Sequence, residues 1–380
     1  MPGRPCRWAA CLLIGLALSG CWDRREIEER NTVLAVGADR CEAPPPCGLV
    51  ITRQIVIPRR VPMGGRTLRG GSKNTVDVLV NDGKDDIDAS GKAQAELHRD
   101  MHFGHIRIFV MGEALARQGL KEYLHWVHSL PEQGYLEWFA VAEGKAGDLM
   151  KARPRLEPVP SLFLYHLLSD AQRAGRIQRM YLSDLQITLA NGGEDATVPL
   201  LAMAGPDRPR LAGLAVFAGA TMVGKLTSDE MVTFQQLRGA PRGSEMIRTV
   251  LPGGHPVTVR VGERQVHYQV RSLETGIAVA IHLRLETDLQ MLGHALSSKD
   301  PRVIRLIEQQ VAAQVQSQAQ ALVHKLQHDL QSDALAIGQR VRAFLPGEWA
   351  AIKDWRAAYR NVSIQVQAEV QVRRTGLAAQ

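Results

Sequence analysis

Residues 300–330 read DPRVIRLIEQQVAAQVQSQAQALVHKLQHDL, and they predict the longest element of the chain. Asp300 suits the N-cap of a helix, and Pro301 suits its first turn. Apolar residues then recur every three or four positions, at Ile304, Ile307, Val311, Val315, Ala319, Leu322, Leu326 and Leu330. This spacing indicates one helix over residues 301–331, about 43 Å long, with one apolar stripe and an opposite face that is mostly glutamine.

The partner of that stripe is predicted by the last strand of the sequence. Val362, Ile364, Val366, Ala368, Val370 and Val372 alternate with Ser363, Gln365, Gln367, Glu369, Gln371 and Arg373. Strict alternation is typical of a sheet with one buried and one solvated face, which is most often antiparallel. We therefore expect a C-terminal antiparallel sheet that the long helix covers.

The first half of the chain has a different organisation. Two apolar strands, 32–39 and 49–57, are expected to form a hairpin, and strands at 105–111 and 136–142 flank a helical stretch at 113–130. This order favours an α/β layer. We expect an α+β protein of several domains with mixed or antiparallel sheets. An N-terminal α/β part would cover residues 32–200, and a C-terminal α+β domain, opened by a hairpin at 211–226, would cover 205–376.

The N-terminus has the features of a bacterial export signal. Arg4 and Arg7 precede an apolar stretch, Trp8 to Leu18, that is too short to span a bilayer. Leu18-Ser19-Gly20-Cys21 follows and looks like a lipobox. We expect residues 1–20 to be a signal peptide, Cys21 to be the lipidated first residue, and residues 21–31 to be a membrane-proximal tether. Two or more acyl chains would anchor the protein stably. An ordinary secretory signal with a chance cysteine is the alternative.

The composition of the chain bears on the state of its cysteines and limits the kinds of partner that it could bind. The chain has five cysteines, of which Cys6 and Cys11 belong to the leader. Cys41 and Cys47 remain, and the sequence leaves open whether they are bonded, because the loop between them is short and rich in proline. The net charge is +7, and without Arg4 and Arg7 of the predicted leader it is about +5, a mild positive charge that suits an anionic lipid surface. Nucleic acid is a poor candidate, because the basic residues are scattered and aromatic residues make up only 5% of the chain.

No motif requires catalysis. Leu97-His98-Arg99-Asp100 resembles a kinase catalytic loop, but the other kinase motifs are missing. His98, His102 and His105 have a spacing that could bind zinc on one helix face, but Gly104 and a strand pattern from His105 interrupt such a helix. We expect no enzyme activity, no metal and no cofactor. A metallohydrolase that uses these three histidines is kept as a hypothesis.

Several stretches, in order, resemble one family, the Ger(x)C lipoproteins, which are the C subunits of bacterial spore-germination nutrient receptors. They are Leu18-Ser19-Gly20-Cys21-Trp22-Asp23-Arg24-Arg25-Glu26-Ile27, Phe103-Gly104-His105, Gly112-Glu113, Gly213 to Phe217, Val223 to Leu226 with Glu230, Ser332-Asp333 to Gly338, Pro346, Trp349, Trp355, and the final strand to Gly376. The resemblance covers nearly the whole chain after the leader. Two departures are the Cys41–Cys47 loop and the charged stretch after Ile27.

The resemblance implies a three-domain α+β lipoprotein on the outer face of the spore inner membrane. It also implies two partners, the integral-membrane A and B subunits of a receptor for nutrient germinants, and a role in nutrient-triggered germination without catalysis. Only lipidation carries over to a residue, Cys21. A solute-binding lipoprotein of a membrane transporter is the alternative function; it would need two α/β lobes around a cleft.

Overall fold

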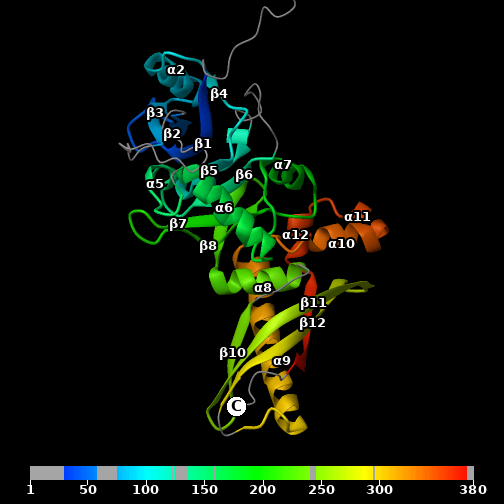
Figure 1. The fold of residues 1–380 in the computed structure, drawn as a ribbon. Helices are drawn as coiled ribbons and strands as arrows, with labels where there is room; N and C mark the ends of the chain where they lie inside the picture. Colours follow the sequence, from blue (N-terminus) through cyan, green and yellow to red (C-terminus); the bar gives the residue numbers. More distant parts are fainter. Residues whose placement is uncertain are drawn as a thin grey trace, which may run out of the picture.

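The structure is a computed structural model. It describes residues 30–57, 75–121, 123–124, 136–157, 159–239, 245–293 and 296–374. These form a broad sheet with surrounding helices, and an arm in which one long helix lies against a second sheet (Figure 1). Helices and mixed sheets together give the α+β fold expected from the sequence.

The first sheet combines parallel and antiparallel pairs. Its order is β3-β2-β1-β5-β6-β7-β8-β9, with β4 also paired to β1. The pairs among β1, β5, β6 and β7 are parallel, and the outer pairs are antiparallel. The strands are β1 (Asn31–Arg40), β2 (Leu49–Val56), β3 (Val76–Gly83), β4 (Met101–His102), β5 (Ile108–Gly112), β6 (Trp138–Ala142), β7 (Thr197–Met203), β8 (Pro209–Ala218) and β9 (Thr221–Thr227).

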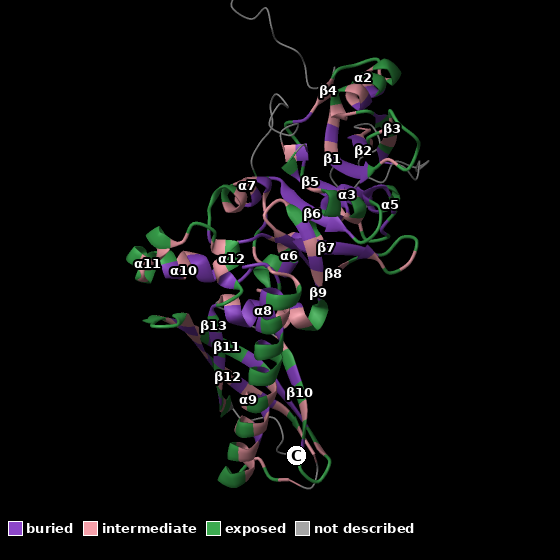
Figure 2. Ribbon diagram, turned by 180° about the vertical axis from the view of Figure 1, so that it is seen from behind, coloured by how far each residue is buried: buried purple, intermediate pink, exposed green. Residues whose placement is uncertain are grey.

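The central strands are buried on both faces because helices cover the sheet. Every residue of β5 and β6 is buried, as continuous apolar strands such as Ile108-Phe109-Val110-Met111 require (Figure 2). The helices of this part are α2 (Asp86–Glu96), α3 (Glu113–Gln118), α5 (Ala146–Lys151), α6 (Pro160–Arg173), α7 (Leu182–Ala190) and α8 (Ser228–Arg238). The expected hairpin of β1 and β2 is present.

The expected division of the chain at residues 200–205 does not coincide with the boundary between the sheets. We expected the hairpin at 211–226 to open the C-terminal domain. Instead, β8 pairs with β7 and β9 pairs with β8, so the first sheet continues to Thr227. The second sheet begins only at β10.

The second sheet is mixed, whereas we predicted an antiparallel one. Its order is β10-β11-β12-β13, and β13 runs parallel to β12 because α9 crosses between them and returns the chain to the start of β12. Residues 256–261 and 265–271 both lie in one long strand, β11. The elements are β10 (Met246–Leu251), β11 (His255–Leu273), β12 (Gly276–Leu292), α9 (Pro301–His324) and β13 (Ser363–Arg374), with α10 (Ile337–Phe344), α11 (Pro346–Ala351) and α12 (Trp355–Tyr359) before β13.

The predicted long helix is confirmed. Asp300 is its N-cap and accepts a hydrogen bond from the backbone N–H of Arg302, and a π-helical turn, Lys325–Asp329, extends it. The apolar stripe enters two cores. Ile307, Val311 and Val315 pack on the second sheet, whereas Ala319, Leu322 and Leu326 belong to a core that the first sheet shares with the near end of the second. One helix therefore joins both parts of the molecule.

The glutamine face of α9 covers the outer edge of β13. Glu308, Gln316 and Gln320 accept hydrogen bonds from the backbone N–H groups of Val372, Ala368 and Val366, at 2.9, 3.2 and 3.0 Å. Gln320 also donates to the carbonyl of Ile364. Along a helix, four residues advance about 6.0 Å, and along a strand, two residues advance about 6.6 Å. Side chains spaced four residues apart on α9 therefore face every second backbone N–H group on the edge of β13. The match closes an edge that would otherwise be open to other strands.

Removing one member of this row should destabilise the arm. Gln320→Ala loses both hydrogen bonds to β13, and we expect the free energy of unfolding, measured by urea denaturation, to fall by about 1–2 kcal/mol. Gln318→Ala is the matched control, because Gln318 is exposed on the same helix and makes no hydrogen bond in the described structure. Equal stability of the two variants would show that the edge contact contributes nothing.

Candidate functional site

The predicted lipidation site, Cys21, lies outside the described residues. The description begins at residue 30, directly before β1. None of the helices within the described ranges is long and apolar enough to cross a membrane.

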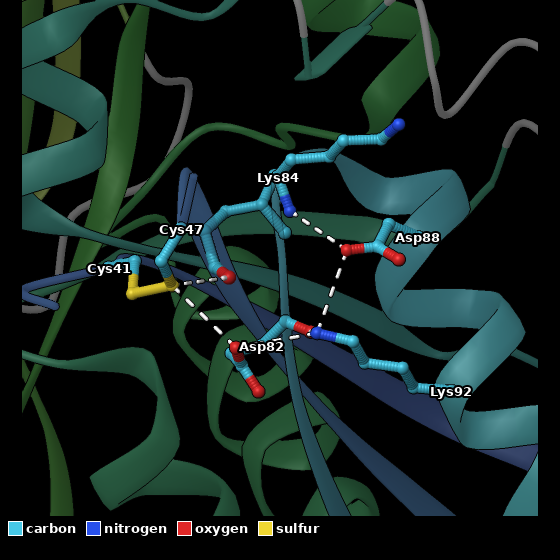
Figure 3. The surroundings of a disulfide bond; sticks show 7 residues. Cys41, Cys47, Asp82, Lys84, Asp88 and Lys92 are labelled. Atoms are coloured by element: carbon cyan, nitrogen blue, oxygen red, sulfur yellow. Dashed lines mark hydrogen bonds and ion pairs between the residues drawn. A yellow bond between two sulfur atoms is a disulfide. The ribbon is translucent and has the colours of Figure 1, made fainter. Parts of the chain in front are cut away.

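Cys41 and Cys47 are joined by a disulfide in the loop between β1 and β2. Figure 3 shows the bond beside the end of β3 and the start of α2. The Sγ atom of Cys47 lies 3.9 Å from Oδ2 of Asp82, and Lys92 reaches both Asp82 and Asp88. The loop is also held through backbone hydrogen bonds of Gly48 to Cys41 and to Gly83.

The three candidate zinc histidines do not form a site. His98 follows α2, His102 lies in β4, and His105 lies in the loop before β5. The rings of His102 and His105 stack edge-on at 5.4 Å, and Nη1 of Arg30 lies 3.0 Å from Nδ1 of His102. Since a guanidinium can only donate, that ring nitrogen accepts. Among the described residues no group of three or more His, Cys, Asp or Glu could hold a metal ion.

A cluster of hydrogen-bonded polar side chains lies where the first sheet and the arm meet, and we call it the polar junction. It contains Asp195, Ser332, Asp333, Trp355 and Arg356. The Gly192-Gly193-Glu194-Asp195 turn comes from the first part, and the Ser332–Gly338 and Trp355 stretches come from the second. The Ser332–Gly338 stretch and Trp355 are among the residues that carry the family resemblance, and the structure brings them together with this turn.

Asp195 and Asp333 are bound to each other by one backbone–backbone hydrogen bond and one bond to the Asp195 carboxylate. The Asp195 N–H donates to the carbonyl of Asp333, and the Asp333 N–H donates to Oδ2 of Asp195 at 2.9 Å. Oδ1 of Asp195 accepts from the N–H of Gly219 and from Arg356, both at 2.7 Å. Ser332 donates to the carbonyl of Phe217. The segment after α9 is therefore fastened to the start of β7 and the end of β8.

The Asp333 carboxylate is fully enclosed. Oδ1 accepts from the N–H of Ile337 at 2.8 Å, and Oδ2 accepts from the N–H of Gly338 and from Nε1 of Trp355, at 2.7 and 2.8 Å. Burial raises the pKa of Asp333 to about 7, although these three donors oppose the rise, and the neighbouring Asp195 adds to it. Asp333 thus caps the start of α10 and binds α12 at once.

Two glycines allow this close approach. A Cβ on Gly338 would lie 2.5 Å from the Cα of Gly193 and 2.5 Å from Nε1 of Trp355. Gly193 has φ +88°, a conformation that side chains rarely adopt. Trp349 and Trp355 stack over this contact with ring centroids 5.3 Å apart. The motif spacing from Ser332 to Trp355 is thereby explained as a packing requirement.

The polar junction fixes geometry and presents no activated nucleophile. Both oxygens of each carboxylate accept hydrogen bonds within the protein. A cavity of about 410 Å³ lies beside it, lined in part by Asn191, Lys353 and Arg356. Sequence reasoning missed the roles of Asp195 and Arg356. Nothing local in the sequence indicates that Asp195 has a partner 138 residues away.

Substitution of Asp333 should weaken the polar junction. In Asp333→Asn an amide NH2 replaces one acceptor oxygen, so at least one buried N–H loses its partner. We expect the free energy of unfolding to fall by about 2–4 kcal/mol in urea denaturation, because each such group left unpaired costs about 1–3 kcal/mol. Asp329→Asn, at an exposed carboxyl in the same segment, should change stability little.

The stability of the wild type should also depend on pH through Asp333. Its pKa rises on folding, from the ordinary value of 3.8 to about 7, so the folded chain holds the proton more tightly. This contribution is complete below about pH 4 and is lost as the pH rises through about 7. Between about pH 4 and pH 7, the urea concentration at the unfolding midpoint should fall with rising pH in wild type and in Asp329→Asn. The part of this fall that comes from Asp333 should be missing in Asp333→Asn. Parallel curves for all three proteins would contradict titration of Asp333.

Two protein families match the chain in succession. Residues 23–203 match the family described as "Spore germination protein N-terminal domain", and residues 212–376 match "Spore germination B3/GerAC like, C-terminal". Together they cover nearly all of the chain from residue 23 onward. They also place the polar junction across both matches, since Asp195 lies in the first and Asp333 in the second.

Curated relatives and one solved structure agree with these matches. The chain is 25% identical to Spore germination protein KC of Bacillus subtilis (strain 168), over 98% of this chain and 97% of the relative. It is 18% identical to Spore germination protein GerQC of Bacillus cereus, over 81% and 85%. The crystal structure of the GerBC protein covers 89% of this chain and 97% of its own, with a TM-score of 0.59 and 15% identity, which shows a shared fold. The chain belongs to the GerAC-like family of spore germination proteins.

Proposed function

We propose that the protein is a lipid-anchored, non-catalytic subunit of a nutrient germinant receptor, needed for nutrient-triggered spore germination. The observation that carries the proposal is the match of both germination-protein families, in order, along the chain. The partners would be the integral-membrane A and B subunits, and the location would be the outer face of the spore inner membrane. Relatives named Spore germination protein A3 and Spore germination protein B3 support a role in germination.

The anchor would be the acylated Cys21. About ten residues separate Cys21 from Asn31, where β1 begins, so the first sheet would lie within about 36 Å of the anchor. The tip of the arm, formed by the start of α9 and the turn between β10 and β11, lies at the opposite end of the molecule from the start of β1 (Figure 1). The arm would then reach away from the point of attachment.

A non-catalytic role fits the use of the buried charges. The carboxylates of the polar junction accept hydrogen bonds that hold the first sheet and the arm together, which is a structural role suited to an interaction protein. Export also suits the cysteines, because a Cys41–Cys47 bond would persist outside the cytoplasm. The alternative of a solute-binding lipoprotein gains no support, since the described residues form one sheet and an arm, and two lobes around a cleft are not seen among them.

Replacement of the lipidated cysteine tests the anchor. Cys21→Ala should leave the protein unacylated, move it out of the membrane fraction of spores, and abolish or strongly slow germination with nutrients, while sporulation remains normal. Membrane fractionation and the loss of optical density on nutrient addition are the measurements. Cys11→Ala is the matched control, because Cys11 leaves with the leader and should have no effect.

Two results would contradict the proposal. Normal nutrient germination in a strain that lacks this protein and all its paralogues would exclude the receptor role. Full membrane retention of Cys21→Ala would exclude the lipid anchor but leave the receptor role standing. Crosslinking of the wild-type chain in spores to two multispanning membrane proteins would support the assignment of A and B subunits as partners.

A further inference from the structure

The first sheet ends in an edge strand, β3, whose outer side is open. The carbonyls of Thr75, just before this strand, and of Gly83, at its end, accept hydrogen bonds from the side of β2. Neighbouring residues of an antiparallel strand direct their backbone groups to opposite sides, so those of Val76, Val78 and Val80 point away from β2. Within the described part of the chain, no residue forms a hydrogen bond with the outward N–H and C=O groups of these valines.

Both edges of the second sheet are covered, by contrast. Side chains of α9 bind the edge of β13 and reach the edge of β10. On β3 a comparable contact is found only at the far end, where Nζ of Lys92 donates to the carbonyl of Asp82 at 2.9 Å. Val80 is 41% exposed beside the open edge. Outward main-chain groups of this kind are a template for pairing with another extended chain.

A cavity of about 660 Å³ lies beside this edge, and we call it the edge groove. It is lined by Val76 and Val78 of β3, and by Met150 of α5 and Pro160 of α6, among others. Val78 is paired with Gln54, whose side-chain amide donates to the carbonyl of Met150 at 2.6 Å. Paired residues share a face of the sheet, so the valine side chains of β3 face α5, which lies next to this end of the sheet (Figures 1 and 2).

Three cations line the edge groove. Exposed and buried side chains alternate over residues 151–155, with Lys151, Arg153 and Arg155 exposed and Ala152 and Pro154 buried. The proline also keeps the residue before it in an extended conformation. None of the three cations makes an ion pair with another described residue. Their charges therefore point to the same side of a short segment at alternate positions, as side chains on one face of a strand do.

The acidic groups at the edge groove do not balance this charge. Glu157 lies 3.7 Å from Nδ1 of His166. Asp77 alternates with the valines, so its side chain is on the opposite face of β3, where Asn81 donates to Glu96 of α2 at 2.7 Å. The three cations outnumber these carboxylates, and the groove suits an acidic ligand.

We propose that the edge groove binds an extended acidic segment of a partner protein, which adds to the first sheet as a strand beside β3. The outward backbone groups of β3 supply main-chain hydrogen bonds, and the three cations pair with acidic side chains at alternate positions of the added strand. A second copy of this chain fits less well, because pairing of two β3 strands presents valines, and not Asp77, to the cations. The contact depends neither on the lipid anchor nor on the proposed germination role.

Fluorescence anisotropy with a labelled synthetic peptide tests the contact. Threonine and glutamate alternate in the peptide, which is about nine residues long, the length of a typical strand. We expect saturable binding to the purified full chain, weakened at least tenfold, or about 1.4 kcal/mol, by the double substitution Arg153→Glu and Arg155→Glu. Arg248→Glu with Arg305→Glu is the matched control, because these arm residues are exposed and make no ion pair in the described structure.

Two further changes separate strand addition from simple charge attraction. Methylation of the peptide amides that face β3 removes main-chain donors and should abolish binding, whereas methylation of the alternate amides should preserve it. Val78→Pro removes an outward N–H from the edge without breaking a bond to β2, which edge strands tolerate. This variant should bind at least tenfold more weakly, whereas Val78→Thr should bind as the wild type does.

Three outcomes would each overturn the proposal. They are no saturable binding of the glutamate peptide, equal binding of a peptide with lysine in place of glutamate, and binding that neither the double arginine variant nor Val78→Pro changes. Analytical ultracentrifugation detects the rival occupant. A dimer of the full chain that Val78→Pro dissociates would assign the edge to a second copy, and would also overturn the proposal.

Discussion

The arrangement of the whole molecule depends on the enclosure of one carboxylate, that of Asp333. A buried charge is tolerated only where donors surround it, and here the donors come from the start of α10 and from α12. The backbone of the same residue is bound to Asp195, in the turn just before β7. Three distant segments must therefore be in place together, and this contact, with the apolar core that both sheets share, holds the arm against the first sheet.

The arm itself depends on a match between two periodicities. Its core is the apolar stripe of α9, but the side chains that flank the stripe bind the free edge of β13, and Gln314 reaches the carbonyl of Arg248 on the opposite edge. Residues four apart on a helix and two apart on a strand advance by nearly the same distance. A glutamine-rich face, which in sequence looks merely solvated, thereby protects both edges of a small sheet.

Local signals could be predicted from the sequence, and pairings between distant residues could not. The α9 helix was predicted because Asp300, Pro301 and the apolar spacing all lie within one element. The parallel direction of β13 was missed because it is set by the crossover through α9, and alternation along Val362–Val372 is the same in either direction. The Ser332–Gly338 stretch was noticed through family resemblance, and only the fold shows that Asp333 and Gly338 serve one contact.

The length of α9 determines how far a movement at the polar junction displaces the tip of the arm. Its 24 residues make a rod of about 36 Å that is fixed at one end by the polar junction and carries the second sheet along its length. A tilt of roughly 5° at the fixed end would move the far end by about 3 Å over a rod of this length. The far end displays Val250 and Met291, exposed apolar residues 58% and 48% accessible. A small change of angle at the polar junction is thus converted into a displacement about as wide as an atom at the far end of α9.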